Sequence, residues 1–322
     1  MTTETHQPSF YIQNIPIYGN LILAPMDGIS DHPFRSLTRR LGSALTYTEF
    51  INARDVINSH PHLEQRLFFT NFERPVVYQL FDDDPERLLE AAVRLESQLP
   101  DVFDLNLGCS ARCVTSRGAG AALLKNPAKI AIILSKLVTR VRQPISAKIR
   151  LGWDENSRNY LEIAKILQEN GASLLAVHAR TKAQKYSGQA DWDAIAEIKA
   201  ILSIPVIANG DIRTVADIDK VITETRCDGV MIGRAAVANP WLFSRLDRHQ
   251  VPNQVIADTL TTHLKDMMDF YGPVLGIRFF RKYCKRILTP ANPDVELLHQ
   301  LLTSLDSNEV GQLIQQILSL YP

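Results

Sequence analysis

The chain has 322 residues, and its 35 basic and 35 acidic side chains give a formal net charge of zero. This balance excludes recruitment of a polyanion by overall charge, so any nucleic-acid surface must be a local patch. The amino-terminal stretch MTTETHQPSF lacks the apolar core of a signal peptide, and no apolar run reaches the roughly 18 residues of a membrane span. Four scattered cysteines do not form a disulfide framework, so we expect a soluble, cytoplasmic protein.

Eight short runs of apolar and β-branched residues recur along the first three-quarters of the chain. They lie at 20–26, 45–50, 76–80, 102–107, 145–150, 174–180, 204–211 and 228–233. The segments between them carry helical periodicity, as in 85–99 and in 158–170, where Gly171 follows as a helix stop. Strands that are apolar on both faces and alternate with helices predict a parallel sheet covered on both sides. Eight such units predict an α/β fold of the (β/α)8 TIM-barrel type.

A residue able to bind or react ends each predicted strand. These residues are Met26, Glu49, Gln79, Asn106, Lys148, His178, Asn209 and the pair Gly233-Arg234. Because the carboxyl ends of all barrel strands meet at one mouth, we predict an active site there. Gly210 and Gly233 lie at the ends of the last two predicted strands, where backbone N–H groups commonly hold phosphate, so we expect a phosphate-bearing cofactor. The alternative is a barrel whose strands simply end in polar residues.

After 240–246 the pattern changes to helices alone, at 255–272, 274–288, 294–305 and 308–321. Four short helices predict a small bundle, so we divide the chain into a catalytic barrel, 1–246, and a helical domain, 247–322. The second helix carries basic residues on one face, with no acid among them: Arg278, Arg281, Lys282, Lys285 and Arg286. This face is a candidate contact for RNA phosphates, and a solvated basic face is the alternative.

Eight stretches resemble the tRNA-dihydrouridine synthase family, in that family's order and spacing. They are LAPMDGISDHPFR (23–35), VYQLF (77–81), DLNLGC (104–109), GAGAALL (118–124), AKIRLGW (147–153), VHARTKAQKYSGQADW (177–192), PVIANGDI (205–212) and CDGVMIGRAAVANPWLF (227–243). The resemblance covers the whole barrel. It implies an FMN enzyme that reduces the C5–C6 double bond of particular uridines in tRNA, with NADPH as the electron source.

The same resemblance implies a role for each site residue. Cys109 is the general acid, and the cofactor-binding residues are Pro25, Met26, Gln79, Lys148, His178, Asn209, Gly210, Asp211, Gly233 and Arg234. Asn106 and Arg180 contact the target nucleotide, and the basic helix grips the tRNA through Arg278, Arg281, Lys282 and Lys285. Two departures stand out: the sequence has Gly-Cys-Ser where the family usually has Gly-Cys-Pro, and the family's RKH-then-WY pattern is only partly present around Arg281.

The chemistry suits these residue types. Reduction of uracil adds a hydride at C6 and a proton at C5, and a thiol with an ordinary pKa of about 8.5 is a protonated general acid near neutral pH. The ammonium group of Lys148 would stabilise negative charge on a reduced flavin. The alternative role for Lys148 is that of the Schiff-base lysine of an aldolase. His178 alone among eight histidines ends a strand, and a structural strand cap is its alternative.

Other features leave several interpretations open. Cys113 is an incidental small residue, a disulfide or redox partner of Cys109, or a metal ligand, although without a second ligand pair we expect no metal site. Glu49 either has a family role or pairs with Arg35 or another arginine. We expect a monomer that binds tRNA and no membrane. The alternative functions are an FMN-dependent small-molecule reductase of the dihydroorotate or dihydropyrimidine dehydrogenase kind, and an RNA-binding protein without turnover.

Overall fold

Eight parallel strands close into a ring in the order β3-β4-β6-β7-β8-β9-β10-β11, and β11 pairs again with β3. They are β3 (Leu21–Leu23), β4 (Leu45–Tyr47), β6 (Val76–Phe81), β7 (Val102–Leu107), β8 (Ile145–Arg150), β9 (Leu175–His178), β10 (Val206–Asn209) and β11 (Gly229–Ile232). Each overlaps one predicted run. The short strand β5 (Ile51–Asn52) pairs with the end of β6. The computed structural model describes residues 7–320; residues 1–6 and 321–322, at the ends of the two predicted domains, lie outside this range.

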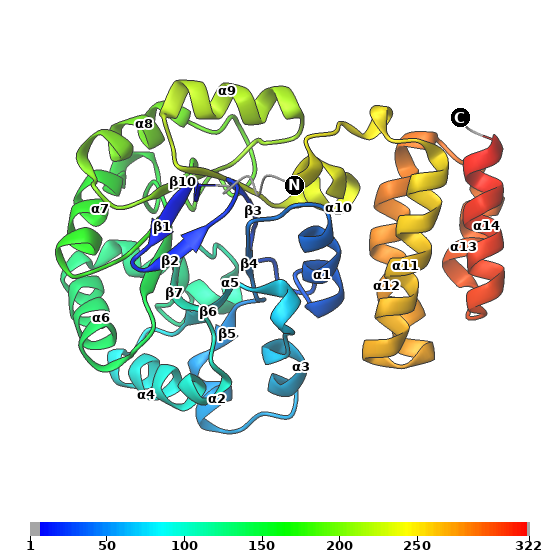
Figure 1. Cartoon of the computed structure of the whole chain (residues 1–322). Coiled ribbons are helices and arrows are strands. Elements are labelled where there is room, and N and C mark those ends of the chain that lie inside the picture. Colours follow the sequence, from blue (N-terminus) through cyan, green and yellow to red (C-terminus); the bar gives the residue numbers. More distant parts are fainter. Residues whose placement is uncertain (1–6, 321–322) are drawn as a thin grey trace.

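Helices surround the ring, which confirms the predicted (β/α)8 barrel (Figure 1). They are α1 (His32–Arg40), α2 (Ala53–Ile57), α3 (Leu63–Leu67), α4 (Pro85–Leu95), α5 (Arg112–Thr115), α6 (Pro127–Arg140), α7 (Tyr160–Glu169), α8 (Trp192–Ile201), α9 (Val215–Thr225) and α10 (Arg234–Ala238). Local sequence sets where they begin. The Asp31 side chain caps α1 by accepting a hydrogen bond from the Phe34 N–H at 3.0 Å. Asp84 and Asn126 cap α4 and α6 in the same way, each followed by proline.

A hairpin that the sequence reading did not predict closes the bottom of the barrel. Strands β1 (Phe10–Ile12) and β2 (Ile15–Ile17) pair antiparallel. Their buried residues pack with the interior of the barrel, and the Gln13 amide donates to Ser173 Oγ at 2.9 Å, just before β9. Because the hairpin covers the amino-terminal end of the strands, the opposite mouth is left for chemistry.

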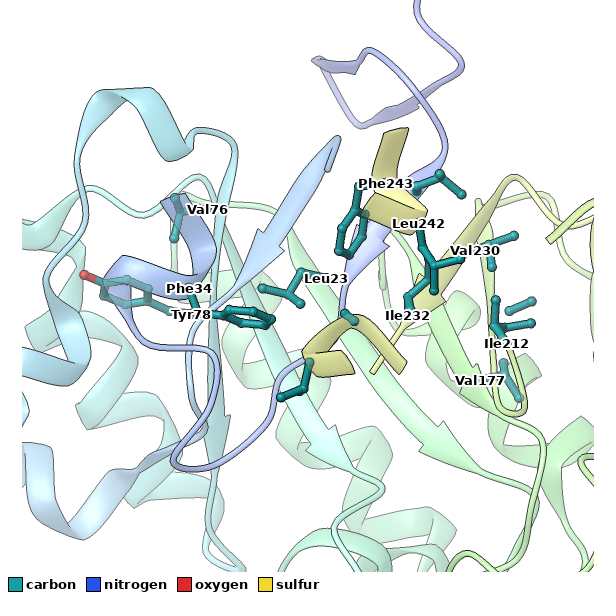
Figure 2. Packing of buried hydrophobic residues seen from close by; sticks show 14 of the residues in the cluster. Leu23, Phe34, Val76, Tyr78, Val177, Ile212, Val230, Ile232, Leu242 and Phe243 are labelled. Carbon is teal, nitrogen blue, oxygen red and sulfur yellow. The ribbon is translucent and has the colours of Figure 1, made fainter. Parts of the chain in front are cut away.

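A second hydrophobic layer lies between the strands and the outer elements. On the outside of the barrel, Leu23 of β3 and Ile232 of β11 share a buried cluster with Leu242 and Phe243, which follow α10 (Figure 2). Phe34 of α1 belongs to the same cluster. The strands are therefore apolar on both faces, as the uniform burial of the predicted runs requires.

Four helices follow the barrel: α11 (Asn253–Tyr271), α12 (Pro273–Leu288), α13 (Val295–Thr303) and α14 (Ser307–Leu320). α11 and α12 lie beside α1 and α10, and α13 and α14 lie on the side of α11 and α12 away from the barrel (Figure 1). This confirms the predicted helical region, while the boundary between residues 246 and 247 stays a prediction. The Tyr283 ring of α12 stacks on Phe34 at 4.8 Å, and its hydroxyl donates to the Ile29 carbonyl at 2.6 Å. No helix within residues 7–320 is long and apolar enough to cross a membrane.

Candidate active site at the barrel mouth

A chain of buried hydrogen bonds runs up the inside of the barrel to its mouth. Ser146 Oγ donates to Asp104 Oδ1 at 2.6 Å, and the Gln79 amide donates to Asp104 Oδ2 at 2.8 Å. The Asn106 amide in turn donates to Gln79 Oε1 at 2.9 Å. Burial raises the pKa of Asp104 to about 6, although these hydrogen bonds and Lys148 favour the charged form. Sequence reasoning missed Asp104. Its position inside an apolar run, two residues before Asn106, could have indicated a buried carboxylate with a role at the site.

The chain of hydrogen bonds ends on the loop that carries the predicted general acid. Asn106 Oδ1 accepts hydrogen bonds from the backbone N–H groups of Gly108 at 3.1 Å and Cys109 at 2.9 Å. The Cys109 carbonyl accepts from the Ala121 N–H at 3.0 Å. Gly120 has a φ of +60°, and a Cβ there would lie 2.9 Å from the Cys109 carbonyl oxygen. The segment that begins with Gly-Ala-Gly (118–120) therefore packs closely against the backbone of Cys109 and supports its loop.

The thiol of Cys109 is kept in its protonated form. The side chain is half-buried, and burial raises its pKa above the usual value. Cys109 and Cys113 are both free thiols, so the disulfide interpretation of Cys113 is wrong. Cys113 is exposed and lines a neighbouring cleft. Within residues 7–320, no three His, Cys, Asp or Glu side chains gather as metal ligands.

Lys148 and His178 both lie at the barrel mouth, and the positive charge of Lys148 lowers the pKa of His178. Lys148 Nζ donates to Asn209 Oδ1 at 3.0 Å, and the Asn209 amide donates to the Met231 carbonyl at 2.8 Å. Burial and the nearby Arg150 lower the pKa of Lys148 to about 7, and Asp104 opposes this shift. Burial, together with the positive charges of Lys148 and Arg150, holds the pKa of His178 far below its usual value. His178 is therefore a neutral imidazole near neutral pH.

The residues after β10 and β11 present a group of backbone N–H donors. Gly210 has a φ of +122°, and a Cβ there would lie 3.1 Å from His178 Cδ2, so only glycine fits easily. The backbone N–H groups of Gly210, Asp211 and Gly233 donate no hydrogen bond to any group within residues 7–320. A Cβ on Gly233 would meet the Met26 sulfur at 3.7 Å, which places Met26 beside these N–H groups. Unpaired N–H groups of this kind suit a phosphate.

Arg180 is fully buried and engaged with the protein. Its guanidinium donates to the carbonyls of Ser187 at 3.0 Å and Gly188 at 2.6 Å, and pairs with Asp211 at 2.6 Å. The Asp211 carboxylate also accepts from the Ala190 N–H at 2.8 Å. These contacts hold the loop after β9 close to Asp211, next to the backbone N–H groups that follow β10. The contact predicted between Arg180 and the target nucleotide stays a prediction.

Arg150 is a second residue that sequence reasoning missed. Its guanidinium donates to the Gly108 carbonyl at 2.8 Å and to the carbonyls of Thr181 and Lys185, both at 2.9 Å. It thus ties the Cys109 loop to the loop after β9. The signal was its position at the end of the run ISAKIR, two residues beyond Lys148. On that second loop, the exposed Tyr186 ring lies 4.0 Å from the Arg234 guanidinium carbon.

A cleft of about 540 Å³ opens between the mouth and the helical region. It is lined by Glu49, Phe50, Cys113, Tyr271 and Lys282, among others. Buried Glu49 accepts a hydrogen bond from the Gly28 N–H. Arg35 pairs with Glu73 at 2.8 Å, so the alternative that Arg35 pairs with Glu49 is wrong.

The structure separates the basic residues of α12 into two groups. Arg278, Lys285 and Arg286 are exposed. Arg281 donates to the carbonyls of Thr303 at 2.9 Å and Ser304 at 3.0 Å, at the end of α13. Lys282 donates to the Gly28 carbonyl in the loop after β3. These two residues therefore have partners inside the protein, and their predicted contacts with tRNA stay predictions.

Comparison with known proteins shows the family of this chain. The family model described as dihydrouridine synthase (Dus) matches residues 22–320. The chain is 39% identical over 271 residues to tRNA-dihydrouridine synthase B of Pseudomonas aeruginosa, covering 82% of each protein. It is 36% identical over 298 residues to a probable tRNA-dihydrouridine synthase of Rhizobium leguminosarum, covering 92% of this chain and 94% of that protein.

Solved structures share the fold at low sequence identity. Histamine dehydrogenase from Rhizobium sp. 4-9 has a TM-score of 0.55 and 11% identity, covering 80% of this chain and 50% of that one. The BexX/CysO complex of Amycolatopsis orientalis gives a TM-score of 0.52 and 17% identity, with 80% and 96% coverage. The family match and the two curated relatives, together with the arrangement at the mouth, establish that this chain belongs to the dihydrouridine synthase family of oxidoreductases, which act on uridine in tRNA.

Proposed function

We propose that this protein reduces the C5–C6 double bond of particular uridines in tRNA, using FMN as cofactor and NADPH as electron source. The observation that carries the proposal is the position of Cys109. The hydrogen bond from its N–H to Asn106 fixes the thiol loop at the mouth that also contains Lys148 and His178. A general acid and a buried cation at one mouth are what reduction of a uracil ring requires.

The residues at the mouth fit FMN. The unpaired N–H groups of Gly210, Asp211 and Gly233 would hold its phosphate, with Arg234 beside them. Lys148 would lie against the flavin ring. The negative charge of the bound cofactor would then favour the charged form of the lysine. Pro25 and Met26, both half-buried at the end of β3, would pack against the flavin. When bound, FMN supplies the hydride that is added at C6.

The protein supplies the proton that is added at C5. Cys109 is protonated because burial raises the pKa of its thiol. A positioned general acid contributes about 10²–10⁴-fold in rate. The chain of hydrogen bonds through Gln79 and Asn106 holds the Cys109 loop in place, and Arg150 holds that loop from the other side. His178 is neutral and can donate or accept a hydrogen bond at the uracil without adding charge.

The tRNA would approach through the cleft between the mouth and the helical region. The family match extends over the helices to residue 320, which supports a role for them in the reaction. Exposed Arg278, Lys285 and Arg286 on α12 would bind backbone phosphates. The target uridine must leave its stack to reach the mouth, which favours a nucleotide in a loop.

The test is direct measurement of dihydrouridine. Purified protein is incubated with NADPH and tRNA from cells that lack the modification, and nucleosides are quantified by mass spectrometry. We expect dihydrouridine to form, and none from a Cys109→Ala control within the same time. Absence of product from an FMN-loaded protein that still oxidises NADPH would overturn the proposal in favour of a small-molecule pyrimidine reductase.

A further inference from the structure

Three loops at the rim of the barrel mouth meet at one tryptophan. Lys125 Nζ lies 3.5 Å from the centroid of the Trp153 ring, and Lys182 Nζ lies 3.8 Å from it. Lys125 comes from the segment after β7, Trp153 from the loop after β8 and Lys182 from the loop after β9. Lys125 is exposed, and the other two are half-buried. Two ammonium groups are therefore held on one indole beside the active site.

The backbone around this cluster, Lys125–Trp153–Lys182, is firmly held. The Lys182 N–H donates to the Gly152 carbonyl and the Ala183 N–H donates to the Trp153 carbonyl, both at 2.9 Å. Gly152 has a φ of +150°, and a Cβ there would lie 2.4 Å from the Ser157 carbonyl oxygen. A glycine is thus required for the close turn that presents Trp153. The positions of Trp153 and of the Lys182 backbone are therefore fixed by this turn.

The positive charge of the cluster is not compensated. Neither Lys125 nor Lys182 forms an ion pair with a carboxylate in the part of the chain that the structure describes, residues 7–320. The nearby Glu155 pairs with Arg158 at 3.5 Å and accepts from Thr181 Oγ1 at 3.4 Å. Contact with an aromatic ring favours a cation but does not neutralise it. Two like charges on one ring are best offset by a bound anion.

The cluster lies across the mouth from the helical region. The helices α11 and α12 pack against α1 and α10, which follow β3 and β11. In the closed ring, β8 stands opposite these two strands, and Trp153 follows β8. Figure 1 shows the same separation, with α6 and α7 on the side of the barrel away from α11–α14. A ligand bound at this rim would reach the mouth from the side that the helical region leaves open.

We propose that Lys125, Trp153 and Lys182 form the site for the phosphate groups of NADPH. The inference rests on the proposed function, in which NADPH must reach the mouth that also receives tRNA. Because two ammonium groups this close to one indole lie on its opposite faces, the adenosine 2′-phosphate and the pyrophosphate, as separate compact anions, would each be bound by one of them. The nicotinamide end would then extend inward toward the flavin. The exposed cations of α12 lie beside the opposite rim, where the longer tRNA backbone would run.

The test measures binding without turnover. The dissociation constants of NADP⁺, NAD⁺ and adenosine 2′,5′-bisphosphate are measured by calorimetry on the FMN-loaded protein, without tRNA. Lys125→Ala and Lys182→Ala are each expected to weaken NADP⁺ and the bisphosphate about tenfold, and NAD⁺ less, because NAD⁺ lacks the 2′-phosphate. Lys165→Ala, which removes an exposed lysine on the outer helix α7, is the matched control. Unchanged flavin absorbance and circular dichroism confirm that the variants fold.

The outcomes separate this inference from the function on which it rests. Unchanged NADP⁺ affinity in the Lys125→Ala/Lys182→Ala double variant overturns the NADPH site. So does a double variant that loses tRNA affinity while NADP⁺ affinity stays the same, because the cluster then contacts RNA. The function itself is tested with wild-type protein reduced by dithionite. Failure of that protein to form dihydrouridine counts against the function alone.

Discussion

The backbone N–H of Cys109 donates a 2.9 Å hydrogen bond to the side-chain oxygen of Asn106. Through Asn106 the thiol loop is connected to Gln79 and then to the buried carboxylate of Asp104. The position of the proposed general acid is therefore set by the interior of the barrel. A loop of similar sequence without this anchor would not place a thiol reproducibly over a substrate.

Removal of the anchor should slow the chemical step. We expect Asn106→Ala to lower the rate of dihydrouridine formation about 10–100-fold, because a small displacement of a catalytic group has effects of that size. The measurement is a single-turnover assay with chemically reduced protein and saturating tRNA. Asn126→Ala, which removes only the cap of α6, is the control for loss of an asparagine. An unchanged rate in Asn106→Ala would show that the loop holds the thiol without it.

Replacement of the two thiols should have opposite outcomes. Cys109→Ala should bind FMN and tRNA but lose about 10²–10⁴-fold in turnover, the usual contribution of a general acid. Cys113→Ala should keep near-normal turnover, because its exposed side chain makes no hydrogen bond that positions the loop. Both are measured by mass spectrometry of the nucleosides. The assignment of Cys109 is wrong if only Cys113→Ala is inactive.

The glycine that supports the thiol loop should not accept a side chain. In Gly120→Ala the new Cβ would meet the Cys109 carbonyl at 2.9 Å with a φ of +60°. We expect a loss of about 1–3 kcal/mol in the free energy of unfolding, measured by urea denaturation, together with reduced turnover. Gly311→Ala is the matched control, because nothing lies within 4 Å of its Cβ in α14. It should be neutral or gain up to about 1 kcal/mol from better helix propensity.

Binding of FMN should be coupled to uptake of a proton. The pKa of Lys148 is lowered to about 7, chiefly by burial, so at pH 8 the side chain is mostly neutral before FMN binds. An anionic cofactor beside it raises that pKa, so FMN binding at pH 8 should take up a proton. At pH 5.5 the lysine is already charged, and uptake by Lys148 should vanish.

Calorimetry in two buffers of different ionisation enthalpy measures this uptake. Lys148→Met should abolish it at pH 8, because no titrating group remains at that position. Between about pH 7 and the ordinary value of 10.5, the unfolded chain binds more protons at Lys148, so its contribution to stability should rise with pH. Equal uptake in Lys148→Met and the wild type would show that another group titrates.

The exposed cations of α12 should carry the salt dependence of tRNA binding. We expect alanine at Arg278, Lys285 and Arg286 to weaken tRNA binding and to lower the slope of log K against log salt by about one for each lost phosphate contact. Filter binding over a range of salt measures both quantities. Lys165→Ala is the control. A slope equal to that of the wild type would remove these residues from the interface.

The same assay distinguishes two roles for Arg281 and Lys282. If they bind tRNA as predicted, alanine at either position lowers the salt slope. If their internal hydrogen bonds are their main role, Arg281→Ala lowers the stability of the bundle instead, because the carbonyls of Thr303 and Ser304 lose a charged donor. Thermal unfolding measured alongside binding separates these results.

Some features were predictable because they depend on near neighbours along the chain. The eight apolar runs and the helical periodicity between them express local packing preferences. They were sufficient to predict the barrel and the helical region after it. The short hairpin at Phe10–Ile17 was missed, because two three-residue strands carry too little periodicity to stand out.

The sequence by itself determined which residues end the barrel strands, since strand ends follow from the apolar pattern and parallel strands bring their ends to one mouth. Only the tertiary structure decided how those residues are held. Asp104 supports Gln79, Arg150 ties two loops together, and Arg281 turns toward α13 rather than standing free on a basic face. Each of these contacts joins residues from different elements, so it depends on three-dimensional packing that no local pattern specifies.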